Sequence, residues 1–272
     1  MKISTATSVL SSYLLDEAIE KVLSIGFDGV DIWCGRPHLH RKDYPENSIN
    51  SLGKKIKSNA LEITSVMPAF LRYPYSLCSP IETVLSDSIG YMLDCIDNAK
   101  MIGAKSVLVP PVKSLIDQSK EDARRIFVRS LEKVSEYADL KMIPLNIEVL
   151  NEQLSDFACR TKDVVQIMRE IGSDKNGIVL DTGHLNMTGE NAESALEEAG
   201  DLLRHVHIHD NNKGGPQFLI PGEGDFDFAG FNRMLKAINY TGFVSLELGA
   251  QYAFAPEEAL REALAKTKKL MS

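Results

Sequence analysis

The sequence lacks the features of membrane-spanning and disulfide-rich proteins. No apolar run approaches the ~20 residues that a membrane-spanning helix needs, and the N-terminal stretch MKISTATSVL lacks the apolar core of a secretory signal peptide. The four cysteines are scattered along the chain and form no C-x-x-C pair. We therefore expect a cytoplasmic protein without a membrane partner, whose cysteines are free thiols in a reducing compartment.

Positive charge is also scarce. The chain has 30 Lys and Arg against 38 Asp and Glu, which gives a formal net charge of −8 at pH 7. Nucleic-acid binding needs a surplus of Lys and Arg on one face to meet the phosphates. The charge balance therefore argues against a nucleic-acid partner and favours a small, neutral or weakly charged substrate.

What the sequence does contain is a regular alternation of short β-rich segments and longer segments of helical periodicity. The helical segments have end signals, such as Gly26 and Gly103 at C-terminal ends and the capping pattern Ser119-x-x-Asp122 at an N-terminal end. The predicted strands are Ile3–Ala6, Gly29–Trp33, Ile63–Met67, Val107–Val109, Leu145–Leu150, Gly177–Asp181, His205–His209 and Phe243–Leu248.

This alternation predicts the fold class. Strands that alternate with helices, without a linker rich in Pro, Ser or Gly, indicate a parallel sheet with crossover helices. The 272 residues suit one (β/α)8 TIM barrel, so we expect a single domain over residues 1–272. A doubly wound open sheet is the alternative. The absence of a Gly-rich turn after the first strand favours the closed barrel.

Each of the last four predicted strands has a charged or histidine residue at or near its C-terminal end. Strands of a parallel barrel are covered on both sides and are expected to be apolar, yet Glu148, Asp181, His207 and Glu247 interrupt them. Taken singly, each could be an ion-pair partner, a turn cap or a packed histidine. Their placement on consecutive strands, at the end where TIM barrels have their active sites, indicates one common site. His205 is expected to point away from it, although it shares strand parity with His207, which leaves its direction open.

The residue types at this site indicate a metal ion. Three carboxylates brought together in a buried place repel one another and lose hydration. A divalent cation would offset both effects, and mixed oxygen and imidazole ligation suits several such ions. We therefore expect one divalent metal ion per chain, with Mn²⁺ first and Co²⁺, Mg²⁺ or Zn²⁺ as alternatives.

Several motifs resemble a known family over essentially the whole chain. The xylose-isomerase-like barrel superfamily of sugar isomerases and epimerases has motifs similar to DTGHLNM (Asp181–Met187), LRHVHIHD (Leu203–Asp210) and PGEGDFDF (Pro221–Phe228). Within it, the fructoselysine 3-epimerase group, and next the ketose 3-epimerases, have segments similar to GFDGVDIWCGRPH (Gly26–His38), YPYS (Tyr73–Ser76) and IPGEG (Ile220–Gly224).

The resemblance implies a role for each residue at the site. It makes Glu148, Asp181, His207 and Glu247 the metal ligands. It makes Glu148 and Glu247 the catalytic acid–base pair as well. His184, the histidine of the D-x-x-H motif, would bind a substrate oxygen.

Other substrate-binding positions differ from the ketose 3-epimerase pattern. Those enzymes usually have a second, sugar-binding Glu six residues after the strand-five ligand, where this chain has Leu154, with Glu152 nearby in a different register. An Arg common after strand seven corresponds to Lys213, which becomes a candidate for substrate binding. Trp33, the only tryptophan, would either stack on a sugar face or belong to the core.

A metal-assisted proton transfer is the chemistry that such a site predicts. A proton next to a carbonyl group leaves only if the developing enediolate is stabilised, and a bound metal ion does this as a Lewis acid. Glu148 and Glu247, on strands five and eight, would remove the C3 proton and return it on the opposite face, which epimerises that carbon. Transfer of a proton between C1 and C2 through the corresponding enediolate would give aldose–ketose isomerisation instead.

Three further alternatives compete with a ketose or fructosamine 3-epimerase. A dehydratase of the inosose or dehydroshikimate type would share the metal site. An apurinic endonuclease would need three zinc ions and His ligands from strands two to four, but ITSVMPAF and SVLVPP contain no His. A non-enzymatic sugar-binding barrel would not need paired carboxylates. The partner is thus expected to be a small sugar or sugar derivative of open identity, and a homo-oligomer is compatible because members of the family commonly pair their barrels.

Overall fold

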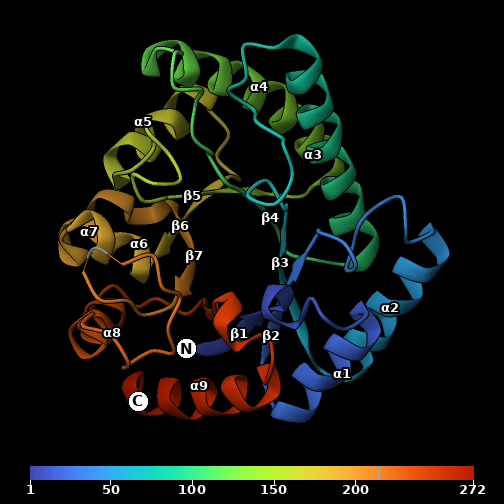
Figure 1. Ribbon diagram of the computed structural model, residues 1–272, viewed down its shortest axis with the longest axis vertical. Coiled ribbons are helices and arrows are strands. Elements are labelled where there is room, and N and C mark those ends of the chain that lie inside the picture. The colour runs from blue at the N-terminus through green and yellow to red at the C-terminus, as the bar shows by residue number, and fades with distance from the viewer. Residues whose placement is uncertain (214) are drawn as a thin grey trace.

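Eight parallel strands close into a barrel in the computed structural model, which describes residues 1–213 and 215–272. Each strand pairs with the next along the chain, and β8 pairs with β1, so the predicted (β/α)8 TIM barrel is confirmed and the open sheet is excluded. Figure 1 shows the helices arranged around these strands. The strands are β1 Lys2–Ala6, β2 Gly29–Trp33, β3 Glu62–Met67, β4 Val107–Val109, β5 Leu145–Glu148, β6 Gly177–Asp181, β7 Leu203–Ile208 and β8 Phe243–Leu246.

The strand ends differ from the predicted ones where they reach the site. β5 ends at Glu148 rather than Leu150, and β8 ends at Leu246, so that Glu247 is the first residue after its strand. A backbone hydrogen bond from the Glu247 N–H to the Ile208 carbonyl at 3.2 Å fixes this residue against β7. Both glutamates therefore lie at the C-terminal rim of the barrel on backbone that is held by neighbouring strands.

The helices are amphipathic and pack their apolar faces onto the outside of the barrel. In α1 the buried residues include Leu15, Ile19 and Val22, and the helix ends at Gly26, whose φ of 91° is left-handed. The helices are α1 Leu15–Ile25, α2 Glu46–Ser58, α3 Glu82–Ile102, α4 Lys120–Lys141, α5 Thr161–Ile171, α6 Thr182–Thr188, α7 Ala192–Ala199, α8 Phe228–Ala237 and α9 Pro256–Leu270, with 3₁₀ turns η1 Thr7–Leu10, η2 Gly200–Leu202 and η3 Ala250–Tyr252.

A second, smaller apolar cluster fills part of the barrel interior. Ala6, Met67, Leu108 and Val179 pack together there, and Trp33 packs against them. Apart from Val179 of β6, these residues come from β1 to β4. All four cysteines are free thiols, as predicted, and all are buried. Among the described residues, no helix combines the length and the apolar character that crossing a membrane requires.

Candidate metal centre

The four residues predicted to bind a metal ion come together at the C-terminal rim of β5 to β8. Glu148, Asp181, His207 and Glu247 each offer one ligand atom, and these atoms all lie within 4.8 Å of one another. The first three residues are buried, and Glu247 is half-buried. Adjacent parallel strands account for this convergence, because their C-terminal ends meet at one edge of the barrel.

Asp181 is oriented by the helix that follows its strand. It is the N-cap of α6, and its Oδ1 atom accepts hydrogen bonds from the backbone N–H groups of Gly183 at 2.7 Å and His184 at 3.1 Å. His209 Nε2 lies 3.0 Å from the same oxygen. The other oxygen, Oδ2, is buried and has no hydrogen-bond partner among the described residues. One carboxylate oxygen therefore fixes the side chain, while the second is free for a ligand.

The His207 ring lies between carboxylates. Its Nδ1 atom is 2.8 Å from Glu148 Oε1 and 3.4 Å from Glu247 Oε2. Burial disfavours the charged imidazolium, but the carboxylates of Glu148 and Asp31 outweigh this effect and raise the pKa of His207 well above its ordinary value. The Nδ1 atom thus lies where the surrounding carboxylates favour a positive charge.

The carboxylates at the rim need positive charge. Burial, together with the negative charges of Glu148 and Asp181, raises the pKa of Glu247 to about 7, although His207 acts in the opposite direction. Their ion-pair partners among the described residues are all histidines rather than Lys or Arg. The free Asp181 oxygen, the Glu oxygens and an imidazole nitrogen form a mixed donor set that fits a divalent metal ion.

His184 lies beside this cluster in a defined orientation. Its Nδ1 atom is 3.0 Å from the Asn151 side-chain nitrogen, and the Asn151 side-chain oxygen accepts from the Gln153 N–H at 2.8 Å, which fixes the amide. The amide therefore donates to Nδ1. Because burial lowers the pKa of His184, the ring is neutral and its hydrogen lies on Nε2. The ring has an N–H group left to donate.

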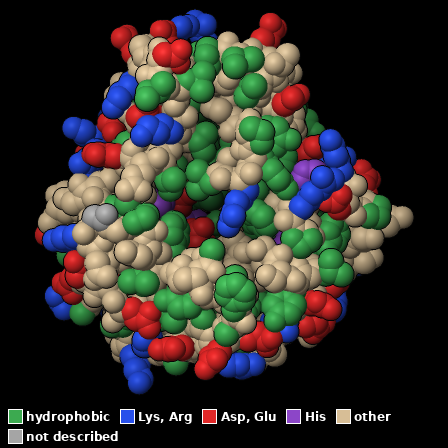
Figure 2. Space-filling view, in the orientation of Figure 1, with side chains coloured by type: hydrophobic (Ala, Val, Ile, Leu, Met, Phe, Trp, Pro, Cys, Tyr) green, Lys and Arg blue, Asp and Glu red, His purple; other side chains and the backbone are tan. Residues whose placement is uncertain are grey.

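A cavity of about 240 Å³ lies above the rim carboxylates. Figure 2 shows the corresponding hollow, with acidic and histidine side chains at its floor and hydrophobic side chains around it. Glu148 and Glu247 line it together with Trp33, Phe218 and Arg72. Trp33 thus both borders the cavity and packs on the interior cluster.

Lys213 lies apart from this lining. It is exposed in the segment after β7, and its backbone N–H donates to Asp225 at 3.2 Å. The residues that line the cavity do not include Lys213 or His184, but the His184 ring meets Phe218 edge-to-face at 5.9 Å. The substrate-binding roles of both residues stay predictions.

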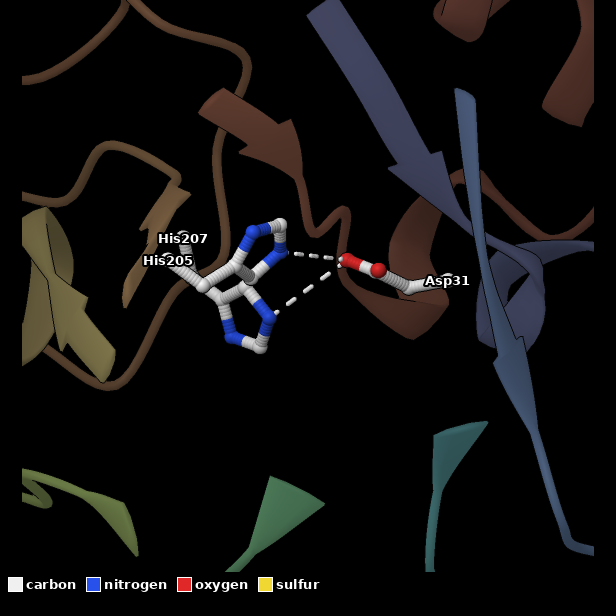
Figure 3. A group of neighbouring side chains, drawn as sticks. All are labelled: Asp31, His205 and His207. Carbon is white, nitrogen blue, oxygen red and sulfur yellow. Dashed lines mark hydrogen bonds and ion pairs between the residues drawn. The ribbon is translucent and has the colours of Figure 1, made fainter. Parts of the chain in front are cut away.

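The structure adds three polar residues that the sequence did not single out. Asn151 holds His184, His209 holds Asp181, and Asp31 on β2 lies against His205 and His207 (Figure 3). Asp31 had a sequence signal, because it interrupts the apolar strand GVDIW as Glu148 interrupts its own strand. His205, expected to point away from the pocket, lies outside the cavity lining but inside the barrel, on the same face of β7 as His207.

Comparisons with known proteins agree with this architecture. A family model described as xylose isomerase-like TIM barrel matches residues 19–270. A fructoselysine 3-epimerase of Shigella flexneri is 25% identical over 94% of this chain and 93% of its own. A D-psicose 3-epimerase of Enterocloster bolteae is 26% identical over 84% of this chain and 75% of its own. The crystal structure of the IOLI protein with a binding zinc atom superposes with a TM-score of 0.82 at 21% identity, and covers 100% of this chain and 98% of that chain.

Proposed function

The chain belongs to the xylose isomerase-like TIM barrel family, and from this premise we propose that it is a divalent-metal-dependent sugar 3-epimerase of the ketose or fructosamine type. The observation that carries the proposal is the position of two glutamates, Glu148 at the end of β5 and Glu247 directly after β8. Glu148 and Glu247 flank Asp181 and His207, and all four offer ligand atoms within 4.8 Å of one another. Relatives named as 3-epimerases and a zinc-containing structural neighbour support this assignment.

Glu148, Asp181, His207 and Glu247 would hold the ion. When bound, a divalent ion supplies the Lewis acidity that makes the hydrogen next to a ketose carbonyl acidic. Glu148 takes the C3 proton from one face of the substrate, and Glu247 delivers a proton to the opposite face, which inverts the centre through an enediolate. The His184 Nε2–H donates to a substrate oxygen and thereby orients the sugar.

The cavity favours a substituted ketose over a free one. Apolar side chains make up most of its wall, including Val9, Leu71 and Phe218, while Ser8, Ser11 and Arg72 also line it. A free ketose would leave hydroxyl groups without partners against such a wall, which is unfavourable. An amine-linked ketose places an alkyl chain there instead, and a relative named fructoselysine 3-epimerase supports this choice.

The test is proton exchange in D₂O, followed by NMR, with Mn²⁺-loaded protein and a substrate panel. The panel contains free ketohexoses and the fructosamines of lysine and of a simple alkylamine. We expect deuterium at C3 and a new C3 epimer, with the fructosamines turned over faster than the ketohexoses. Loss of water would show a dehydratase, and an aldose product with deuterium at C2 would show an isomerase. Either result, or no exchange with any sugar, would overturn the proposal.

A further inference from the structure

We propose that Asp31 is a positioning residue of the metal centre, which holds the His207 ring with Nδ1 facing the rim carboxylates. The inference rests on the proposed metal-dependent function and concerns a residue outside the ligand set. Asp31 comes from β2, which β8 and β1 separate from β7 in the closed sheet, and it is fully buried. It is absent from the residues that line the cavity, so it acts through His207 rather than on the substrate.

The two histidines of β7 converge on one oxygen of Asp31. Figure 3 shows both rings directed at this carboxylate. His205 Nε2 lies 2.9 Å from Oδ2, and His207 Nε2 lies 3.5 Å from the same atom. The second separation is too long for a well-formed hydrogen bond, so the carboxylate orients the His207 ring mainly by charge. The opposite nitrogen of that ring, Nδ1, is the one near Glu148 and Glu247.

This arrangement selects one tautomer of His207. An imidazole that binds a metal ion must leave the ligating nitrogen unprotonated, so its hydrogen has to lie on the other nitrogen. A carboxylate beside Nε2 favours a hydrogen there and leaves the Nδ1 lone pair for the ligand. Carboxylates next to metal-binding histidines act in this way, and their removal typically weakens metal binding 10- to 100-fold.

Asp31 is itself held in place from two sides. The Thr64 hydroxyl of β3 donates to Oδ1, and His205 approaches Oδ2. The ion-pair partners of Asp31 among the described residues are the two histidines, without Lys or Arg. A buried carboxylate is costly unless it is paired, and here its partners lie on the strand that supplies the metal-binding imidazole. Asp31 is therefore placed to hold the His207 ring in its orientation.

Two competing roles for Asp31 lead to different expected results. Asp31 could contribute to the folding of the barrel alone. Its replacement would then lower the stability of the protein but leave the metal affinity of the folded protein unchanged. Alternatively, Asp31, His205 and His207 could bind a second metal ion, because their ligand atoms also lie within 4.8 Å of one another. Metal stoichiometry and affinity, measured without any sugar, distinguish all three roles.

The experiment compares the full-length wild type with Asp31→Asn, which keeps the shape of the side chain and removes its charge. Affinity for Mn²⁺ and Co²⁺ is measured by competition with a chromophoric chelator, stoichiometry by elemental analysis, and Co²⁺ geometry by visible absorption. We expect one equivalent in both proteins, a 10- to 100-fold weaker affinity in the variant and an altered Co²⁺ spectrum. Excess metal should restore much of its turnover.

Ser245→Ala is the matched control, because Ser245 pairs with His207 in the sheet and its buried hydroxyl has no partner among the described residues. We expect it to bind metal like the wild type. Thr64→Val, which removes only the support of Oδ1, should weaken binding several-fold, and it tests the proposal if Asp31→Asn does not fold.

Some outcomes overturn the inference. Unchanged affinity in Asp31→Asn, or in Thr64→Val where Asp31→Asn is unfolded, would leave Asp31 with a folding role only. Two equivalents in the wild type and one in the variant would identify a second metal site. A wild type that binds no metal would instead refute the proposed function itself.

Discussion

The two halves of the barrel use the same βα unit for different purposes. Strands β1 to β4 contribute Ala6, Trp33, Met67 and Leu108 to an apolar cluster inside the barrel. The four rim residues of the candidate metal centre lie at or next to the C-terminal ends of β5 to β8. At the rim the first half is the apolar half, because Trp33, Met67 and Leu108 of its cluster border the cavity. Electrostatic interactions are stronger in such apolar surroundings. We infer that the four strand ends of the second half carry the proposed chemistry, while residues of both halves shape the space above them.

Asp31 is the exception that joins the halves. It belongs to β2 in the apolar half, yet its carboxylate lies 3.5 Å from His207 of β7. The contact crosses the barrel below the cavity, so the imidazole is held between the rim carboxylates above and Asp31 beneath. The two halves therefore differ at the rim, where one half is apolar and the other has the candidate metal ligands. Beneath the rim, both halves contribute residues to the support of His207.

The proposed difference between the two halves would be refuted most clearly if the rim carboxylates of the second half were not needed for epimerisation. Glu148→Gln and Glu247→Gln keep an oxygen ligand and remove a base. Loss of a positioned general base costs ~10²–10⁴ in rate, so each variant should lose epimerisation by at least this factor at saturating Mn²⁺. Steady-state turnover measures the loss, and deuterium exchange tests whether one variant still exchanges hydrogen from a single face.

Glu152→Gln is the control for these variants. Glu152 lies in the segment after β5, is exposed and pairs with Arg160 at 3.4 Å. Its variant should turn over like the wild type. Near wild-type turnover by either Glu148→Gln or Glu247→Gln, once metal content has been restored, would refute the two-base mechanism.

His184 tests whether substrate orientation also belongs to the second half. His184→Ala removes the Nε2–H donor but no predicted metal ligand. A hydrogen bond to a charged group is worth ~1.5–3 kcal/mol, so kcat/KM should fall roughly 10- to 100-fold while the metal content stays at one equivalent. If metal is lost from this variant, His184 is a ligand and its predicted role is wrong.

The sequence predicted the features that depend on periodicity. The barrel followed from the alternation of strands and helices, and the meeting of Glu148, Asp181, His207 and Glu247 followed from the parallel strands. Both follow from short-range patterns and one topological rule, because neighbouring strands of a barrel end at the same rim. Their roles as metal ligands stay predictions.

The features that depend on long-range packing were not predicted. Asp31 and His205 are 174 residues apart in the chain, and nothing local pairs them. Helix α6 was also missed, because its 7 residues are too few for a helical period and its start depends on Asp181 acting as a cap. The apolar wall arises where several loops meet, so no single segment of sequence encodes it.

The acid–base state of the rim predicts how metal binding depends on pH. A pKa of about 7 for Glu247 means that a proton competes with the metal ion below this pH. The raised pKa of His207 adds a second competing proton and extends the effect above pH 7. The apparent affinity should therefore rise with pH, by up to about tenfold per pH unit for each proton displaced.

Isothermal titration with Mn²⁺ from pH 6 to pH 8, in buffers that do not bind metal, measures this dependence. Glu247→Gln removes one of the competing protons and should flatten the slope below pH 7. Constant affinity across this range in the wild type would mean that the carboxylate and the imidazole are already deprotonated without the metal.

The smallest expected effect concerns the apolar half. Trp33 lines the cavity and packs on Ala6, Met67, Leu108 and Val179. If this half only shapes the space above the metal, Trp33→Ala should raise KM for the sugar without changing metal affinity. Aromatic stacking contributes ~0.5–1.5 kcal/mol beyond burial, which corresponds to a rise of roughly 2- to 12-fold.

Trp33→Phe keeps an aromatic face and should recover most of this loss, so the pair separates stacking from volume. An unchanged KM in Trp33→Ala would make Trp33 a core residue alone, and weaker metal binding would show that the wall also supports the rim.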